Sequence, residues 1–103
     1  MRPPILIVDD DPDIRESLTD MLGHEGYLVD SAASGTDALQ QAKQTRYDAA
    51  LLDIQLPDLN GLSVLKVLME LDASLPVIIL TGNVTPENTI GSLAKGAFAY
   101  LTK

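Results

Sequence analysis

The sequence predicts an α/β fold in which a parallel sheet is covered by helices on both faces. Short apolar runs occur at Ile5–Val8, Ala49–Leu52 and residues 77–80, and weaker runs occur at 27–31 and 98–101. The longer stretches between these runs repeat apolar residues at helical spacing. Strands that alternate with helices, and that are apolar without interruption, are typical of buried parallel sheets. Because crossovers between parallel strands are right-handed, the alternation indicates a doubly wound sheet of five strands.

Four amphipathic stretches are expected to form the helices between these strands. Asp11-Pro12 and Thr85-Pro86 each place a capping side chain before a proline in the first helical turn. The glycines that are expected to mark helix ends are Gly23, Gly26 and Gly96. The apolar positions of the four helices are, in order, Ile14, Leu18, Met21 and Leu22; Ala38, Leu39 and Ala42; Leu62, Leu65, Leu68 and Met69; and Ile90, Leu93 and Ala94.

Composition excludes several classes of protein. The 103 residues suit one domain, and 46% hydrophobic with only 4% aromatic residues predicts an aliphatic core. Because cysteine is absent, disulfides, zinc–thiolate sites and thiol catalysis are excluded. No apolar stretch reaches membrane-spanning length and the first residues do not resemble a signal peptide, so we expect a cytoplasmic domain without a membrane partner. The net charge of -8 argues against direct binding to nucleic acid.

Three consecutive aspartates, Asp9, Asp10 and Asp11, follow the first apolar run directly. Carboxylates this close together repel one another and need a compensating cation or water. Hard divalent metals prefer oxygen ligands, so the cluster predicts a metal site at the end of the first strand. Asp11 is expected to cap the following helix instead, because it stands immediately before Pro12.

Reactive side chains are expected to follow the other strands as well. Asp53 follows the third strand, Thr81 the fourth and Lys103 the fifth. Because the carboxyl ends of parallel strands share one edge of the sheet, these groups should converge on the aspartate cluster. The set fits Mg²⁺ and phosphoryl transfer, with Asp53 as the nucleophile and Lys103 neutralising charge on the phosphoryl oxygens. Thr81 would donate a hydrogen bond to the transferred group.

In these motifs the chain resembles the receiver domain of bacterial two-component response regulators (CheY-like). The resemblance covers essentially all of residues 1–103, with the motifs in order and at family-like spacing. It implies a flavodoxin-like sheet with the strand order 2-1-3-4-5. The motifs that carry it are Ile5-Leu6-Ile7-Val8-Asp9-Asp10, Asp53-Ile54-Gln55-Leu56-Pro57-Asp58-Leu59-Asn60-Gly61, Thr81-Gly82 and Gly96-Ala97-Phe98-Ala99-Tyr100-Leu101-Thr102-Lys103.

The resemblance also implies a ligand set and a phosphoryl donor. Asp53 would be the phospho-acceptor, and a sensor histidine kinase or phosphotransfer protein would supply the group from phosphohistidine. Asp10, Asp53 and the backbone carbonyl of Gln55 would bind Mg²⁺, with Asp9 acting through water. Thr81 and Lys103 would assist the transfer.

By the same resemblance, Thr81 and Tyr100 form a switch pair that reports phosphorylation to a partner or output domain. The domain would be a phosphorylation-activated switch rather than a multi-turnover enzyme, limited to phosphorylating and dephosphorylating itself. The segment from Thr81 to Lys103 resembles regulators with DNA-binding or ATPase outputs, which favours a role in transcription regulation. The sequence leaves open whether the domain forms a dimer when it is phosphorylated.

The chain departs from the family after Lys103, where a proline and a fifth helix are usual and neither is present. A five-stranded sheet without that helix would leave part of one face exposed. We therefore expect the sequence to be a fragment truncated at its carboxyl end, with the output domain on the missing part.

Three other classes of protein share part of this sequence pattern. A haloacid-dehalogenase-type phosphatase fragment shares the Asp-x-Asp after a strand, but needs more acids late in the chain, where Glu87 is the only one after Asp72. An EF-hand loop would need glycine where Ile14 stands and glutamate where Asp20 stands. A flavin-binding module would need a hydroxyl- and glycine-rich phosphate loop after the first strand, where this chain has three aspartates that would repel a phosphate.

Overall fold

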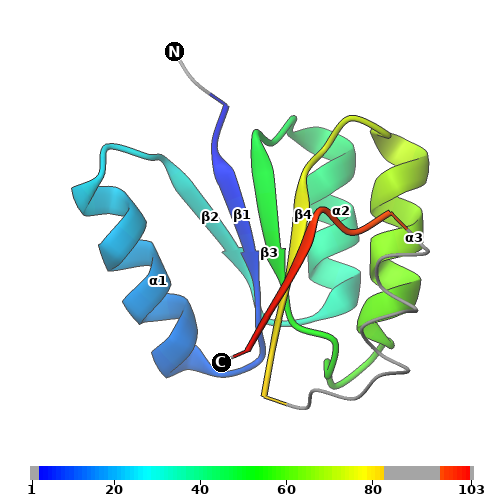
Figure 1. The fold of residues 1–103 in the computed structure, drawn as a ribbon, viewed down its shortest axis with the longest axis horizontal. Helices are drawn as coiled ribbons and strands as arrows, with labels where there is room; N and C mark the ends of the chain where they lie inside the picture. The colour runs from blue at the N-terminus through cyan, green and yellow to red at the C-terminus, as the bar shows by residue number, and fades with distance from the viewer. Residues whose placement is uncertain (1–2, 83–95, 103) are drawn as a thin grey trace.

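The predicted α/β fold and its strand order are confirmed. The computed structural model describes residues 3–82 and 96–102. Its sheet has five parallel strands in the order β2-β1-β3-β4-β5. The strands run toward a common edge, at the bottom of Figure 1, where the predicted site residues should meet. Their bounds are β1 Ile5–Val8, β2 Val29–Ala32, β3 Ala49–Leu52, β4 Val77–Thr81 and β5 Ala99–Thr102.

Helices cover both faces of this sheet. Among the described residues, α1 (Pro12–His24) lies on one face, while α2 (Gly35–Gln44) and α3 (Gly61–Leu71) lie on the other (Figure 1). No described helix has both the length and the apolar character needed to cross a membrane. The helix expected around Ile90, Leu93 and Ala94, with its start at Thr85-Pro86, falls outside the described residues.

Each described helix begins at a side chain that accepts a hydrogen bond from an amide of its own first turn. Asp11 accepts from the amide of Asp13 at 2.9 Å, which confirms its predicted role as the cap of α1. Ser34 and Asn60 act in the same way at the starts of α2 and α3. The first amides of a helix have no partner within the helix, so these caps stabilise its start. The predicted turn at Asn60-Gly61 is therefore the point where α3 begins.

The main core lies between the sheet and the pair α2 and α3. Successive side chains of a strand point to opposite faces, so β1 contributes Leu6 and Val8 to this layer. Ile7 lies on the other face, beside Leu18 of α1. Burial on both faces explains why β1 is apolar at all four positions. The larger side chains of the main core are Leu6, Val8, Tyr47, Leu52, Ile54, Val64, Leu65, Leu68, Leu75, Val77 and Ile79.

The limits of three strands differ from the prediction. The strand expected at 27–31 is observed at Val29–Ala32, and the strand expected at 98–101 begins and ends one residue later. Leu28 is 56% exposed, so its apolar character does not reflect a place in the sheet. β4 includes Thr81 as its last residue, whereas Thr81 was expected to follow the strand.

The end of α1 also differs from the prediction, which gave Gly23 as a stop signal. The helix continues through Gly23 to His24. The chain turns at Gly26, where φ is +90°. Only glycine adopts this left-handed conformation without strain, so Gly26 is the glycine that ends the helical segment.

We expect Leu68→Ala to lower the free energy of unfolding by about 2–5 kcal/mol, because the substitution leaves a cavity in the main core. Leu68 is 1% exposed. Leu71→Ala is the matched control, since Leu71 lies on the same helix and is 46% exposed. Urea unfolding should show a much smaller loss for this control. Equal losses for the two variants would contradict the described orientation of α3.

At Gly61, the start of α3 lies close to the end of β3. A Cβ at this position would lie closer than 3.0 Å to backbone atoms of Ile54 and Asp53. We therefore expect Gly61→Ala to destabilise the fold by about 1–3 kcal/mol in urea unfolding. Gly23→Ala is the control, because a Cβ on Gly23 meets nothing within 4 Å. Alanine within a helix should raise stability there by about 0.5 kcal/mol. A neutral Gly61→Ala would show that the close approach is absent in solution.

Candidate functional site

Three of the predicted site residues meet at the carboxyl edge of the sheet. Asp9, Asp10 and Asp53 each offer a carboxylate oxygen, and these oxygens all lie within 4.8 Å of one another. Strand pairing explains the convergence. Val8 and Leu52 are register partners at the ends of β1 and β3, so the aspartates that follow them emerge side by side.

The three carboxylates differ in exposure. Asp9 is 2% exposed and Asp53 is 4% exposed, whereas Asp10 is exposed to solvent. The Asp9 carboxylate accepts a hydrogen bond from the amide of Asp11 at 2.9 Å. Its backbone carbonyl accepts a bond of 2.7 Å from the Arg15 guanidinium, which brings a positive charge to this edge of the sheet. Backbone and side-chain donors therefore hold Asp9 in place, while Asp10 faces water.

Asp53 is held at the central strand by bonds on both sides. Its amide donates to the carbonyl of Val8 at 2.9 Å, which extends the pairing of β1 and β3 by one residue. Its carboxylate accepts a bond of 3.1 Å from the amide of Gln55. Gln55 also bridges to Asn60, so the loop between β3 and α3 closes at its base. The position of Asp53 is thus fixed by the sheet and by the first turn of this loop.

The donor set fits a small hard cation. Carboxylate oxygens are the ligands that Mg²⁺ prefers, at about 2.0–2.1 Å in octahedral geometry, so two oxygens on opposite sides of one ion stand ~4.2 Å apart. The oxygens of the cluster span at most 4.8 Å, close to that separation. The exposed side of the cluster, at Asp10, would let water complete the coordination. The three aspartates can therefore hold a divalent ion between them.

The remaining predicted residues are less completely described. Thr81 is the last residue of β4 and pairs with Thr102, and Tyr100 lies in β5 opposite Ile79. The backbone of Thr81 therefore reaches the edge of the sheet at which the aspartates lie. Lys103 falls outside the described residues.

Asp58, in the loop between β3 and α3, was not among the predicted site residues. Its carboxylate accepts hydrogen bonds from the amide of Gly35 at 2.8 Å and from the amide and hydroxyl of Thr36 at 2.9 and 2.5 Å. The Thr36 hydroxyl, followed by the two amides, lowers the pKa of Asp58 to about 2. The carboxylate is therefore charged at any physiological pH. Its partners lie 22 and 23 residues away in the sequence, so no local pattern indicates this contact.

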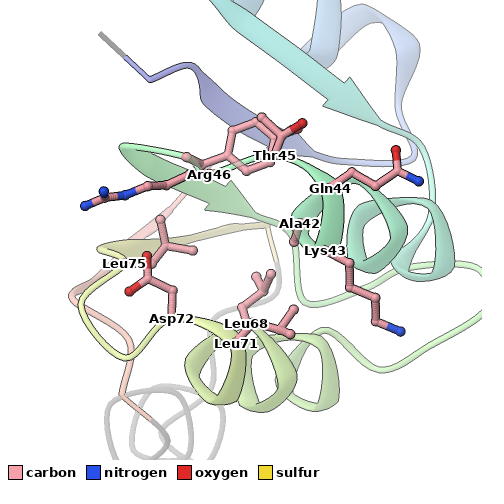
Figure 2. Close-up of a pocket in the computed structure, with 10 residues that line it drawn as sticks. Ala42, Lys43, Gln44, Thr45, Arg46, Leu68, Leu71, Asp72 and Leu75 are labelled. Carbon is pink, nitrogen blue, oxygen red and sulfur yellow. The ribbon is translucent and has the colours of Figure 1, made fainter.

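A separate cavity of about 410 Å³ lies at the opposite edge of the sheet. Leu68, Leu71 and Leu75 form its apolar wall, and Lys43 and Arg46 point in different directions at its rim (Figure 2). Tyr47 also lines the cavity, and its hydroxyl donates to Asp30 at 2.8 Å. Burial and this bond raise the pKa of Tyr47 to about 12, so the phenol stays neutral. Asp72 is the single carboxylate among the lining residues, so the cavity lacks a cluster of carboxylates like the one at Asp53.

Comparison with known proteins identifies one family. Residues 5–103 match the response regulator receiver domain. Transcriptional regulatory protein PrrA from Mycobacterium leprae is 40% identical over 101 residues, which are 98% of this chain and 43% of that protein. The chain thus spans less than half the length of this relative.

Solved structures agree with the described fold. A CheY-like response regulator receiver domain protein from Methanospirillum hungatei is 38% identical, with a TM-score of 0.97 over 100% of this chain and 82% of that chain. A response regulator from Burkholderia pseudomallei, solved with a phosphorylated aspartic acid, a calcium ion and citrate, is 27% identical. Its TM-score is 0.94 over 98% of this chain and 59% of that chain.

The fold and these matches together decide between the functions that the sequence left open. The strand β1, rather than a helix, precedes Asp9, which removes the EF-hand alternative. The match over 5–103 favours the receiver over a haloacid-dehalogenase-type phosphatase fragment, because it accounts for the whole set of motifs. The chain belongs to the response regulator receiver domain family, and is a phosphorylation-activated switch of two-component signalling.

Proposed function

We propose that Asp53 is the phospho-acceptor of this switch. The observation that carries the proposal is the gathering of Asp9, Asp10 and Asp53 oxygens within 4.8 Å at the carboxyl edge of the sheet. Asp53 stands at the end of the central strand, where the loop to α3 begins. The related response regulator from Burkholderia pseudomallei contains a phosphorylated aspartic acid, which supports an aspartate as the acceptor here.

In the proposed reaction a carboxylate oxygen of Asp53 attacks the phosphorus of a phosphohistidine. The donor belongs to a sensor histidine kinase or a phosphotransfer protein. As the new P–O bond forms, the P–N bond breaks and the histidine nitrogen keeps the electron pair. Water later hydrolyses the acyl phosphate and restores the Asp53 carboxylate. Each molecule therefore accepts one phosphoryl group and loses it, as a switch does.

Asp10, Asp53 and the backbone carbonyl of Gln55 would hold Mg²⁺, with Asp9 acting through a water molecule. The bound ion would neutralise negative charge on the transferring phosphoryl oxygens. The exposure of Asp10 supports a direct contact, because its carboxylate can turn toward an ion without breaking the core. Asp9 is buried and bonded to the amide of Asp11, which favours the more distant role.

Thr81 and Lys103 would contact the phosphoryl oxygens, and Thr81 and Tyr100 would form the switch pair. The pairing of Thr81 with Thr102 supports this, because it aligns the ends of β4 and β5 and Lys103 follows directly. Phosphorylation would bias an equilibrium between two existing conformations. The surface near β5 would then present the change to a partner.

The partners and the location of the whole protein are proposed from its relatives. PrrA from Mycobacterium leprae, of which this chain spans 43%, is a transcriptional regulatory protein. We place residues 1–103 as one receiver domain in a longer cytoplasmic protein, whose output domain acts in transcription. The receiver itself would not bind nucleic acid, because its net charge is -8. Phosphorylation-dependent dimerisation is compatible with this scheme.

Asp53→Asn should abolish labelling by a phosphoryl donor, because an amide is a poor nucleophile toward phosphorus. The measurement is intact mass after incubation with acetyl phosphate and Mg²⁺. Asp48→Asn is the matched control, since Asp48 is an exposed aspartate at the other end of the same strand. This control should be labelled as the wild type is. If Asp53→Asn is labelled equally well, the acceptor is another residue.

Asp10→Asn should weaken Mg²⁺ binding by about 10- to 100-fold, because it replaces a charged ligand with a neutral one. Amide chemical shifts in an NMR titration with MgCl₂ give the affinity. Asp11→Asn provides the control, because asparagine caps a helix as well as aspartate does. It removes the same charge one residue away and should change the affinity much less. Equal losses would indicate a general effect of charge, and an unchanged affinity for Asp10→Asn would put the ion elsewhere.

A further inference from the structure

The loop between β3 and α3, residues 54–60, is attached at both its base and its tip. At its base, the amide of Gly61 donates to the carbonyl of Ile54 at 2.7 Å, and Gln55 bridges to Asn60. At its tip, Asp58 contacts the first turn of α2 through both carboxylate oxygens. One segment thus joins the acceptor strand to a helix that carries none of the predicted site residues.

Packing holds part of this loop in place, since Ile54 belongs to the main core and Leu56 and Leu59 pack against it. Residues 54–60 line a recess of about 500 Å³, so space rather than side chains lies against part of the loop. Leu59 lies close to α2, because a Cβ on Gly35 would stand 2.9 Å from the Leu59 side chain. The bonds of Asp58 therefore supply much of the directional restraint on the outer part of the loop.

The bonds to Asp58 are well matched to the start of a helix. α2 already has its own cap, because Ser34 accepts from the amide of Asp37. The amides of Gly35 and Thr36, which a helix cannot satisfy within its own first turn, both donate to Asp58. A carboxylate at this position also lies favourably in the helix dipole. The lowered pKa of Asp58 has the same cause, since these donors stabilise the charged form.

We propose that Asp58 is a positioning residue for the phosphoryl-transfer site, because its bonds to Gly35 and Thr36 fix the loop that presents the Gln55 carbonyl to the metal. The inference rests on the proposed Mg²⁺ site. Asp58 touches neither the ion nor the phosphoryl group in this scheme. It acts through the backbone between Gln55 and Asn60, whose freedom it restricts.

The coupling has to be reciprocal. If the Asp58 bonds favour the metal-binding form of the loop, bound Mg²⁺ must strengthen those bonds by the same factor. The amides of Gly35 and Thr36 report on the bonds directly, since both donate to Asp58. Metal binding should therefore slow hydrogen exchange at the start of α2, well away from the aspartate cluster in sequence.

Asp58→Ala is the first test, with Mg²⁺ affinity measured by NMR titration. Loss of the three bonds should weaken binding by about fivefold, within the range of coupling between residues of one bonded network. Asp72→Ala is the matched control, because Asp72 also accepts bonds from a backbone amide and a hydroxyl, both of Ser74. These bonds lower the pKa of Asp72 as well, but Asp72 lines the cavity at the opposite edge. A merely structural role predicts lower thermal stability in both variants and no change in Mg²⁺ affinity in either.

Thr36→Val tests the same contact from the α2 side and disturbs the loop less. It removes only the hydroxyl bond to Asp58 and should weaken Mg²⁺ binding by about twofold. In the Asp58→Ala background the same substitution should have no further effect. If Asp58→Ala does not fold, the role of Asp58 is tested by the Mg²⁺ affinity of Thr36→Val and by hydrogen exchange at Gly35 and Thr36 in the wild type. Exchange there should slow about fivefold when Mg²⁺ binds.

The outcomes separate this inference from the proposed function. Wild-type Mg²⁺ affinity in Thr36→Val, with unchanged exchange at Gly35 and Thr36, overturns the role of Asp58. If Asp10→Asn still weakens binding in that case, the metal site itself stands. A wild-type domain that binds no Mg²⁺ overturns both proposals.

Discussion

The structure depends on placing two buried carboxylates side by side at one edge of a parallel sheet. The pairing of Val8 with Leu52 brings Asp9 and Asp53 together, and neither can move away without disturbing a central strand. Burying a charge is unfavourable unless donors or cations compensate it. The amides of Asp11 and Gln55 provide part of that compensation. A divalent cation held by the three aspartates would compensate the charge further, so the sheet creates a place suited to a metal.

The same edge also limits which residues can follow β3. Because α3 begins against the backbone of Asp53 and Ile54, the chain needs glycine at Gly61. The loop between them then has to leave the sheet and return within a few residues. The bridge between Gln55 and Asn60 at its base, and the contact of Asp58 with α2, give the loop one defined path. Fold stability and the geometry of the proposed acceptor, Asp53, therefore depend on the same short segment.

How much of this structure can be predicted depends on how far apart in the sequence the partners of each interaction lie. Asp11 could be predicted as a cap because its partner is two residues away. The convergence of Asp10 and Asp53 could be predicted because parallel strands share their carboxyl edge. The predicted start of β2 was wrong, because Leu28 is apolar like a strand residue although it lies just before the strand. The contact of Asp58 with Gly35 crosses 23 residues and depends on how two loops meet, so no local pattern contains it.

The difference in exposure between Asp9 and Asp10 bears on how a switch can remain reversible. A site in which every ligand was buried would bind its ion firmly but would resist the exchange of ligands that accompanies phosphorylation and hydrolysis. Here the buried pair is fixed by the sheet, and Asp10 alone faces solvent. Its carboxylate can exchange with water without exposing any part of the core. In the proposed site the sheet would thus determine where an ion binds, while the exposed Asp10 would allow the ion to enter and leave.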